Sequence, residues 1–178
     1  MSFKLIREKK IFTARVFTLQ QEKWRGPDGH IFERSTITHP GAVAILPFDS
    51  EGRLLMIKQF RPAIRDYLLE IPAGTLEKGE KPLACAKREL IEETGFAAKK
   101  WKALGYIFTA PGFCSERIFL FKAWDLKPAF AEQDDDEHIA PPTPFTMSQV
   151  KKAVTGGKIC DGKTLSCLLQ WQWRKNKK

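Results

Sequence analysis

Glu89, Glu92 and Glu93 stand at positions i, i+3 and i+4 of one continuous segment. On an α-helix this spacing places all three carboxylates on one side, close enough to share a cation. Carboxylates so close repel one another, by roughly 3 kcal/mol for a pair about 5 Å apart at an effective dielectric of about 20. A divalent cation would remove that penalty, so the spacing favours a metal site. The ordinary alternative is an acidic helix face exposed to solvent.

A helix over residues 82–94 is the element that must carry these carboxylates. Pro82 suits the first helical turn, where its missing N–H costs no hydrogen bond. Gly95 follows as the expected C-terminal stop. Aliphatic residues recur at helical spacing along one flank and predict its buried stripe, which leaves the acids on the remaining arc, facing a cleft. The stripe consists of Leu83, Ala84, Ala86, Leu90 and Ile91.

The helix and the loop before it resemble the Nudix box, the signature of hydrolases that act on nucleoside diphosphates linked to another group. The resemblance implies a Mg²⁺-dependent pyrophosphatase of the α/β class, an α/β/α sandwich with a mixed sheet. It also implies that the carbonyl of Ala73 and the carboxylates of Glu89 and Glu93 bind the metal and serve catalysis, with Glu92 assisting. The matching positions are Gly74, Glu80, Arg88, Glu89, Leu90, Glu92, Glu93, Gly95 and Phe96.

Stretches outside the box resemble the ADP-ribose pyrophosphatase branch of this family. They are residues 58–62 with 69–74, the loop 111–116, and the late segment 157–164. In that branch a proline fifteen positions after Phe96, here Pro111, marks a preference for ADP-ribose. The resemblance implies hydrolysis of ADP-ribose or a related nucleoside diphosphate sugar to a nucleoside monophosphate and a sugar phosphate. It extends to enzymes that act on nucleotide sugars such as GDP-mannose.

The chemistry that such an enzyme needs can be argued from the residues themselves. A pyrophosphate link is polyanionic, so its hydrolysis requires a deprotonated water and neutralised phosphoryl charge. Cations held by the three glutamates could serve both needs. Arg61 can offer a planar guanidinium fork to a diphosphate oxygen. Its alternative role is a surface salt bridge with Asp66 or Glu70. Mg²⁺ is the expected ion, and Mn²⁺ is possible.

The loop at residues 111–116 carries three further candidates for substrate binding. Phe113 follows a Pro-Gly turn and can stack on the substrate or line its pocket, although a core phenylalanine is an equal alternative. Ser115 and Glu116 can bond the terminal sugar hydroxyls. They can equally serve only to fix the conformation of their own loop.

The acidic run at residues 132–137 is a second cluster of carboxylates. Such a run is more often a solvated loop than a site. In the resembling branch, however, a loop at this place supplies the general base or a further metal ligand, which implies such a role for Glu137 or Asp135. Residues 140–144 then carry three prolines, which cannot sit inside a central strand. The choice between Glu137 and Asp135 therefore stays open.

We expect an N-terminal arm at residues 1–40 and, as the resemblance implies, a Nudix domain at residues 41–178. Alternation at residues 11–24 and 31–38, around a Gly-Pro-Asp-Gly turn, predicts a long antiparallel hairpin for the arm. Periodicity in the domain predicts strands followed by two late helices. The predicted strands are 41–48, 53–60, 67–71, 101–109 and 117–124, and the helices are 147–154 and 164–173.

The arm has two interpretations. It can simply cap the sandwich. In the resembling branch such arms pair across a twofold axis and lend residues to the partner's site, which implies a homodimer. Candidates for holding the adenine or its amino group are then Trp24, Arg25, Phe32 and Glu33.

Composition sets broad limits. The chain has 178 residues, of which 43% are hydrophobic and 29% charged, and this suits one globular domain with a small appendage. No apolar run approaches the length of a membrane span, and the N-terminus shows no signal-peptide pattern. The four cysteines lack metal-binding spacing, so free thiols in a reducing cytoplasm are the simplest interpretation.

The formal net charge of +9 also has two interpretations. A frayed, solvated basic tail at residues 174–178 is favoured over a basic rim that attracts the anionic substrate. No basic stripe follows a predicted helix, which disfavours nucleic-acid binding.

Two competing functions come from other classes. One is a nucleotide or RNA sensor without catalysis, which usually lacks the box carboxylates; the other is a pyrophosphohydrolase for NTPs or capped RNA.

Overall fold

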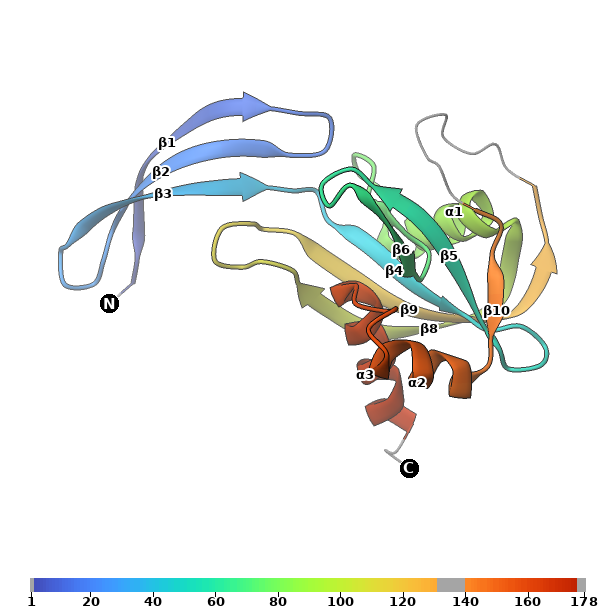
Figure 1. Cartoon of the computed structure of the whole chain (residues 1–178). Coiled ribbons are helices and arrows are strands. Elements are labelled where there is room, and N and C mark those ends of the chain that lie inside the picture. The colour runs from blue at the N-terminus through green and yellow to red at the C-terminus, as the bar shows by residue number, and fades with distance from the viewer. Residues whose placement is uncertain (1, 131–139, 176–178) are drawn as a thin grey trace. The chain divides into compact units, whose positions relative to one another are not determined.

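The computed structural model describes residues 2–130 and 140–175 (Figure 1). The contacts between Cα atoms divide the chain into two compact units. The first unit consists of Met1–Gly41 and Phe108–Arg117, and the second of Ala42–Ile107 and Ile118–Lys178. The first unit thus includes a segment from the middle of the chain, and the division at residues 40/41 stays a prediction. In chain order the elements are β1 (Lys4–Thr13), β2 (Thr18–Arg25), β3 (Ile31–Thr38), β4 (Ala42–Pro47), β5 (Leu54–Arg61), β6 (Asp66–Glu70), β7 (Ala73–Thr75), α1 (Pro82–Thr94), β8 (Phe96–Phe108), β9 (Arg117–Pro128), β10 (Thr143–Phe145), α2 (Met147–Thr155) and α3 (Gly162–Lys175).

The first unit is built on an antiparallel sheet in the order β1-β2-β3, one strand more than the predicted hairpin. The prediction of a single strand at residues 11–24 is wrong, because the chain reverses between Ala14 and Phe17, where the Ala14 N–H donates to the Phe17 carbonyl (2.9 Å). The loop Phe108–Arg117 joins this sheet through Ile37, whose N–H donates to the Phe113 carbonyl (2.7 Å).

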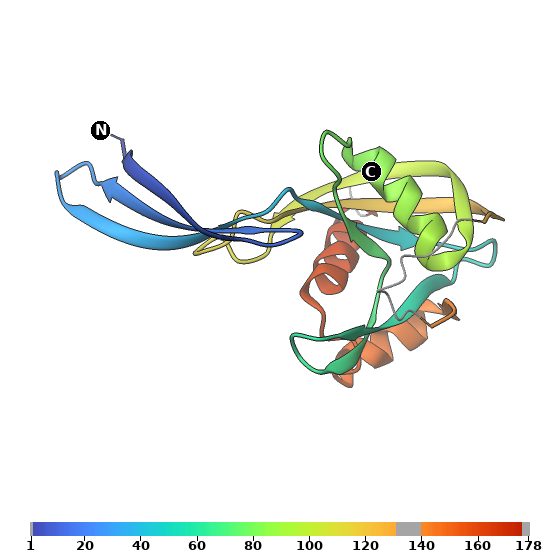
Figure 2. The same cartoon turned by 90° about the horizontal axis from the view of Figure 1, so that it is seen from above.

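The second unit is an α/β/α sandwich around a mixed sheet in the order β7-β4-β9-β8, as predicted (Figure 2). Strand β4 is buried throughout because both of its faces are covered. Val43 and Ile45 pack in one core cluster with Leu90 of α1. The alternate residues Ala44 and Leu46 pack in the other cluster, with side chains of α2 and α3. The sheet therefore carries α1 on one face and the two late helices on the other.

Helix α1 begins and ends where the sequence predicts. Pro82 occupies the first turn, and Gly95 ends the helix in the left-handed conformation (φ 72°), donating its N–H to the Ile91 carbonyl. The predicted stripe is partly wrong, because Leu83 and Ala84 are exposed and Cys85 is buried instead. The arc that faces the sheet includes Glu89 and Glu93, so these two acids belong to the buried side of the helix.

A second sheet in the order β10-β5-β6 completes this unit. Strand β10 contains Pro144, which pairs with Leu55, and it lies at the edge of the sheet. A proline lacks the N–H of a ladder residue and is tolerated only at an edge, so the prediction that the proline run avoids a central strand is confirmed.

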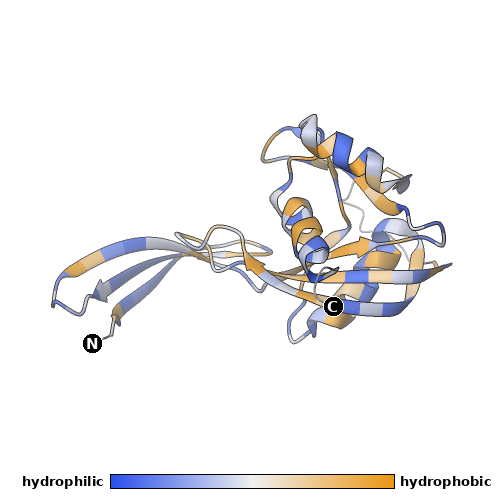
Figure 3. Ribbon diagram, turned by 90° about the horizontal axis from the view of Figure 1, so that it is seen from below, coloured by the Kyte–Doolittle hydropathy of each residue, from blue (hydrophilic) through white to orange (hydrophobic). Residues whose placement is uncertain are grey.

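The helices carry hydrophobic and hydrophilic residues along their lengths (Figure 3). None of the helices in the described ranges combines the length and the apolar character needed to cross a bilayer.

Candidate active site

Two buried carboxylates of α1 lie against the backbone of β7. Glu93 is 1% exposed, and its Oε2 accepts a hydrogen bond from the Ala73 N–H at 2.8 Å. Glu89 is 7% exposed and lies so close to Gly74 that a Cβ atom there would stand 1.8 Å from Cδ of Glu89. Only glycine leaves room for this carboxylate. The structure thus brings together Ala73, Glu89 and Glu93, three of the predicted metal-binding residues.

Arg88 compensates the charge of the glutamates beside it. Its Nη1 lies 2.8 Å from Oε1 of Glu89 and 2.8 Å from Oε2 of Glu92. Its Nη2 lies 3.1 Å from Oε2 of Glu80 and donates to the Thr75 carbonyl at 3.3 Å. Burial alone would lower the pKa of Arg88, but the hydrogen bond to Glu80 and the charge of Glu89 raise it above its usual range. Arg88 therefore pairs with neighbouring glutamates and offsets the repulsion between their carboxylates.

The donor set fits a hard divalent cation. Carboxylate and carbonyl oxygens are the ligands that Mg²⁺ and Mn²⁺ prefer, and the space that Gly74 leaves allows a carboxylate to meet the loop backbone. Within the described ranges, however, no three His, Cys, Asp or Glu side chains are arranged to hold a metal ion. The contacts above give the reason: Arg88 engages Glu89 and Glu92, while Glu93 turns one oxygen to Ala73. The oxygens suit a cation in type, and Arg88 competes for two of the carboxylates.

Arg61 makes the salt bridge that the sequence offered as an alternative, with Glu70 rather than Asp66. Its Nε lies 2.7 Å from Oε1 of Glu70. Burial alone would lower the pKa of Arg61, but the hydrogen bond and charge of Glu70, followed by the charge of Glu93, raise it above its usual range. Because the charge of Glu93 raises the pKa of Arg61, the guanidinium interacts electrostatically with the buried carboxylates. Because Glu70 engages Nε, the outer edge of the guanidinium can still serve an anion.

Two of the three candidate residues of the loop Phe108–Arg117 make hydrogen bonds, Ser115 to a residue outside the loop and Glu116 to a residue within it. Ser115 Oγ accepts a hydrogen bond from the His39 N–H at 3.0 Å, and Glu116 Oε2 accepts one from Thr109 Oγ1 at 2.7 Å. Phe113 is exposed, so the interpretation of this side chain as a core residue is wrong. A role of these three residues in substrate binding stays a prediction.

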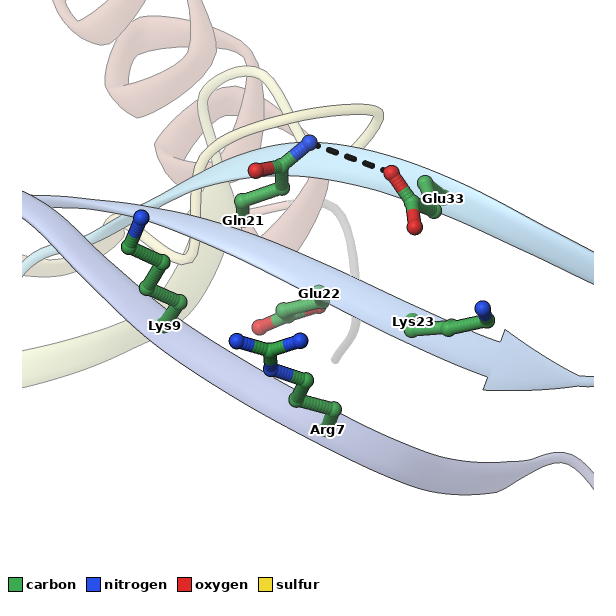
Figure 4. Close-up of a pocket in the computed structure, with 6 residues that line it drawn as sticks. All are labelled: Arg7, Lys9, Gln21, Glu22, Lys23 and Glu33. Atoms are coloured by element: carbon green, nitrogen blue, oxygen red, sulfur yellow. Dashed lines mark hydrogen bonds between the residues drawn. The ribbon is translucent and has the colours of Figure 1, made fainter.

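Glu33 lies in a pocket of the first unit (Figure 4). The pocket encloses about 210 Å³, and Oε2 of Glu33 accepts a hydrogen bond from Gln21 Nε2 at 3.1 Å. Basic side chains line it as well, so its charge is mixed. The lining residues are Arg7, Lys9, Gln21, Glu22, Lys23 and Glu33.

The predicted site residues are thus distributed over both units. Arg61 and the glutamates of α1 lie in the second unit, whereas Glu33 and the loop candidates Phe113, Ser115 and Glu116 lie in the first. Asp135 and Glu137 lie outside the described residues.

The predicted site did not include two residues at the start of α3, Lys163 and Thr164. Lys163 contacts Oε2 of Glu70, and Thr164 Oγ1 accepts a hydrogen bond from the Ile71 N–H at 3.1 Å. The sequence signal was the segment 157–164, which carried a resemblance but no role. Its contacts with Glu70 and Ile71 span 93 positions of sequence, so no local pattern announces them.

Comparisons with known proteins agree with this arrangement. The family model described as NUDIX domain matches residues 38–159. "ADP-ribose pyrophosphatase" of Bacillus subtilis (strain 168) is 38% identical over 162 residues, which cover 90% of this chain and 88% of that protein. "Methanol dehydrogenase activator" of Bacillus methanolicus is 37% identical over 91% of this chain and 88% of its own.

A solved structure has the same fold. The "Crystal structure of ADP compounds hydrolase" superimposes with a TM-score of 0.87 at 23% sequence identity, covering 99% of this chain and 96% of that one. The match of the family model covers the loop and helix that hold the buried carboxylates, and the relatives extend over most of the chain. The chain therefore belongs to the NUDIX domain family.

Proposed function

We propose that this protein hydrolyses the pyrophosphate bond of ADP-ribose or a related nucleoside diphosphate sugar, releasing a nucleoside monophosphate and a sugar phosphate. The observation that carries the proposal is the pair of buried carboxylates, Glu89 and Glu93, seated against the backbone of Ala73 and Gly74. The names of the relatives support the choice of substrate, since the Bacillus subtilis protein is an ADP-ribose pyrophosphatase.

NUDIX hydrolases generally need a divalent cation, and we propose Mg²⁺, with Mn²⁺ as a substitute. Glu89, Glu92, Glu93 and the Ala73 carbonyl would hold it. When bound, such an ion neutralises phosphoryl charge and lowers the pKa of a coordinated water.

The residues of the chain have complementary tasks in this proposal. The Ala73 N–H fixes the orientation of Glu93 through its hydrogen bond. The guanidinium of Arg61, held at Nε by Glu70, binds a phosphate oxygen with its outer edge. Glu137 or Asp135, outside the described residues, takes the proton of the attacking water.

The test is a panel of substrates with Mg²⁺ or Mn²⁺ and separation of the products. We expect ADP-ribose to yield AMP and ribose 5-phosphate faster than GDP-mannose, UDP-glucose, NTPs or capped RNA are cleaved. Faster cleavage of NTPs or capped RNA would contradict the proposed substrate and would identify a NUDIX pyrophosphohydrolase of the other kind. Calorimetric binding of nucleotide with no cleavage of any diphosphate would support a sensor and contradict the proposal.

We also propose that the first unit pairs with that of a second copy, and that Glu33 contributes to the partner's site. All ten residues of β1 are exposed, including apolar side chains such as Phe12 (58% exposed). Exposed apolar surface on a small sheet is costly in water, and a second copy would cover it.

The assembly is tested by light scattering coupled to size-exclusion chromatography. We expect a particle of twice the chain mass of 20.3 kDa, and a monomer after Phe12→Asp. Leu169→Asp, at a residue of α3 that is also exposed (47%), is the control and leaves the dimer intact. A monomeric wild-type protein would contradict the proposed dimer.

We propose a cytoplasmic location as well. All four cysteines are free thiols, which suits a reducing compartment.

A further inference from the structure

A row of side chains with alternating charge links α3 to Arg61. It runs from Asp161 through Lys163 and Glu70 to Arg61. Nε of Arg61 lies 2.7 Å from Oε1 of Glu70, whose carboxylate is completely buried. The Lys163 ammonium contacts the other oxygen, Oε2, and lies 3.2 Å from Oδ1 of Asp161. The two oxygens of Glu70 therefore serve two different cations.

The far end of this row of charges, Asp161, is fixed by the backbone N–H and the side-chain hydroxyl of Thr164. Oδ2 of Asp161 accepts hydrogen bonds from the N–H (2.9 Å) and the Oγ1 (2.6 Å) of Thr164. Burial alone would raise the pKa of Asp161, but the charge of Lys163 and the bonds from Thr164 hold it below its usual range. Asp161 is thus ionised at neutral pH, and Lys163 stands between two carboxylates in a fixed place.

The division of Glu70 between two cations has a consequence for Arg61. An arginine beside an isolated carboxylate prefers a bidentate contact, in which two of its nitrogens meet both oxygens. Lys163 occupies Oε2 and so blocks this arrangement. The guanidinium is then restricted to contact through Nε, and its outer edge remains available to a phosphate.

We propose that Lys163 is a positioning residue for Arg61: by occupying one oxygen of Glu70, it keeps the guanidinium from closing over that carboxylate. Removal of Lys163 frees Oε2, and Arg61 turns inward to take it. The diphosphate of the substrate then loses its arginine contact, although Lys163 itself touches no part of the substrate. This inference rests on the proposed function for the identity of the ligand.

The experiment is a double-mutant cycle on binding. The dissociation constant of a non-cleavable methylene-bridged analogue of ADP-ribose is measured by calorimetry for wild type, Lys163→Met, Arg61→Gln and the double variant. If Lys163 acts through Arg61, Lys163→Met raises Kd about tenfold in the wild-type background and less than about twofold in the Arg61→Gln background. An equal increase in both backgrounds would overturn the proposal, since a direct contact or a general loss of structure acts without Arg61.

Two further variants control the cycle. Lys158→Met removes an equal charge from an exposed position of the same segment, and we expect no change in Kd. Should Lys163→Met not fold, Lys163→Gln replaces it, because the shorter uncharged amide also gives up the ion pair with Glu70. If the wild-type protein binds the analogue without cleaving ADP-ribose, the proposed function fails, and the cycle still decides the role of Lys163.

Discussion

Replacing Glu93 by glutamine is expected to lower kcat by about a thousandfold, because the cation that would stabilise charge in the transition state loses a ligand. The substitution conserves volume at a residue that is 1% exposed, and the amide oxygen of glutamine can still accept the hydrogen bond from the Ala73 N–H. What disappears is the negative charge. The fold therefore survives while the proposed cation loses a ligand.

Steady-state kinetics and thermal unfolding on the same sample separate these two effects. We expect the melting temperature of Glu93→Gln to stay within about 3 °C of wild type. Glu77→Gln, an exposed glutamate of the preceding loop, serves as control and keeps full activity. Wild-type turnover by Glu93→Gln would show that this carboxylate holds no cation needed for the reaction.

Gly74→Ala is expected to cost at least about a hundredfold in kcat while leaving most of the stability intact. A Cβ atom at this position would lie 1.8 Å from Cδ and 1.9 Å from Oε1 of Glu89, so the carboxylate must leave its place. The displaced atoms are the end of a flexible side chain, which can swing away from the loop. The backbone of Gly74 is not in the left-handed region, so the effect is steric.

The matched control for this prediction is Gly162→Ala, the same chemical change where no atom lies within 4 Å of the new methyl group. Activity and melting temperature of both variants are measured side by side. A fully active Gly74→Ala protein would mean that catalysis does not depend on where Glu89 lies.

The sequence could predict α1 and its glutamates because the relevant signals are local. Pro82, Gly95 and the spacing of the acids all lie within one helix, and each has a direct conformational meaning. The burial of Glu89 and Glu93 could not be predicted in this way. Periodicity assigns charged residues to solvent, whereas here the glycine loop and the Ala73 N–H give two carboxylates a place inside.

The end of β1 and the start of β8 were harder to predict, because the local residues do not mark them. The reversal after β1 uses Ala14, Arg15, Val16 and Phe17, none of which is a typical turn residue, so residues 11–24 read as one continuous strand. Strand β8 begins at Phe96, five positions before the predicted start at Trp101. It lies at the edge of its sheet, and the exposed Lys99 and Lys100 hide the alternation.

The contacts of Arg88 also determine what the protein does without a cofactor. Since Arg88 meets Glu80, Glu89 and Glu92, and Glu93 has its bond to Ala73, we expect the polypeptide to reach its folded form without an ion. A zinc finger, by contrast, collapses when its metal is withdrawn. We therefore expect a chelator to stop catalysis while the fold persists, and a resupplied divalent cation to restore turnover without refolding.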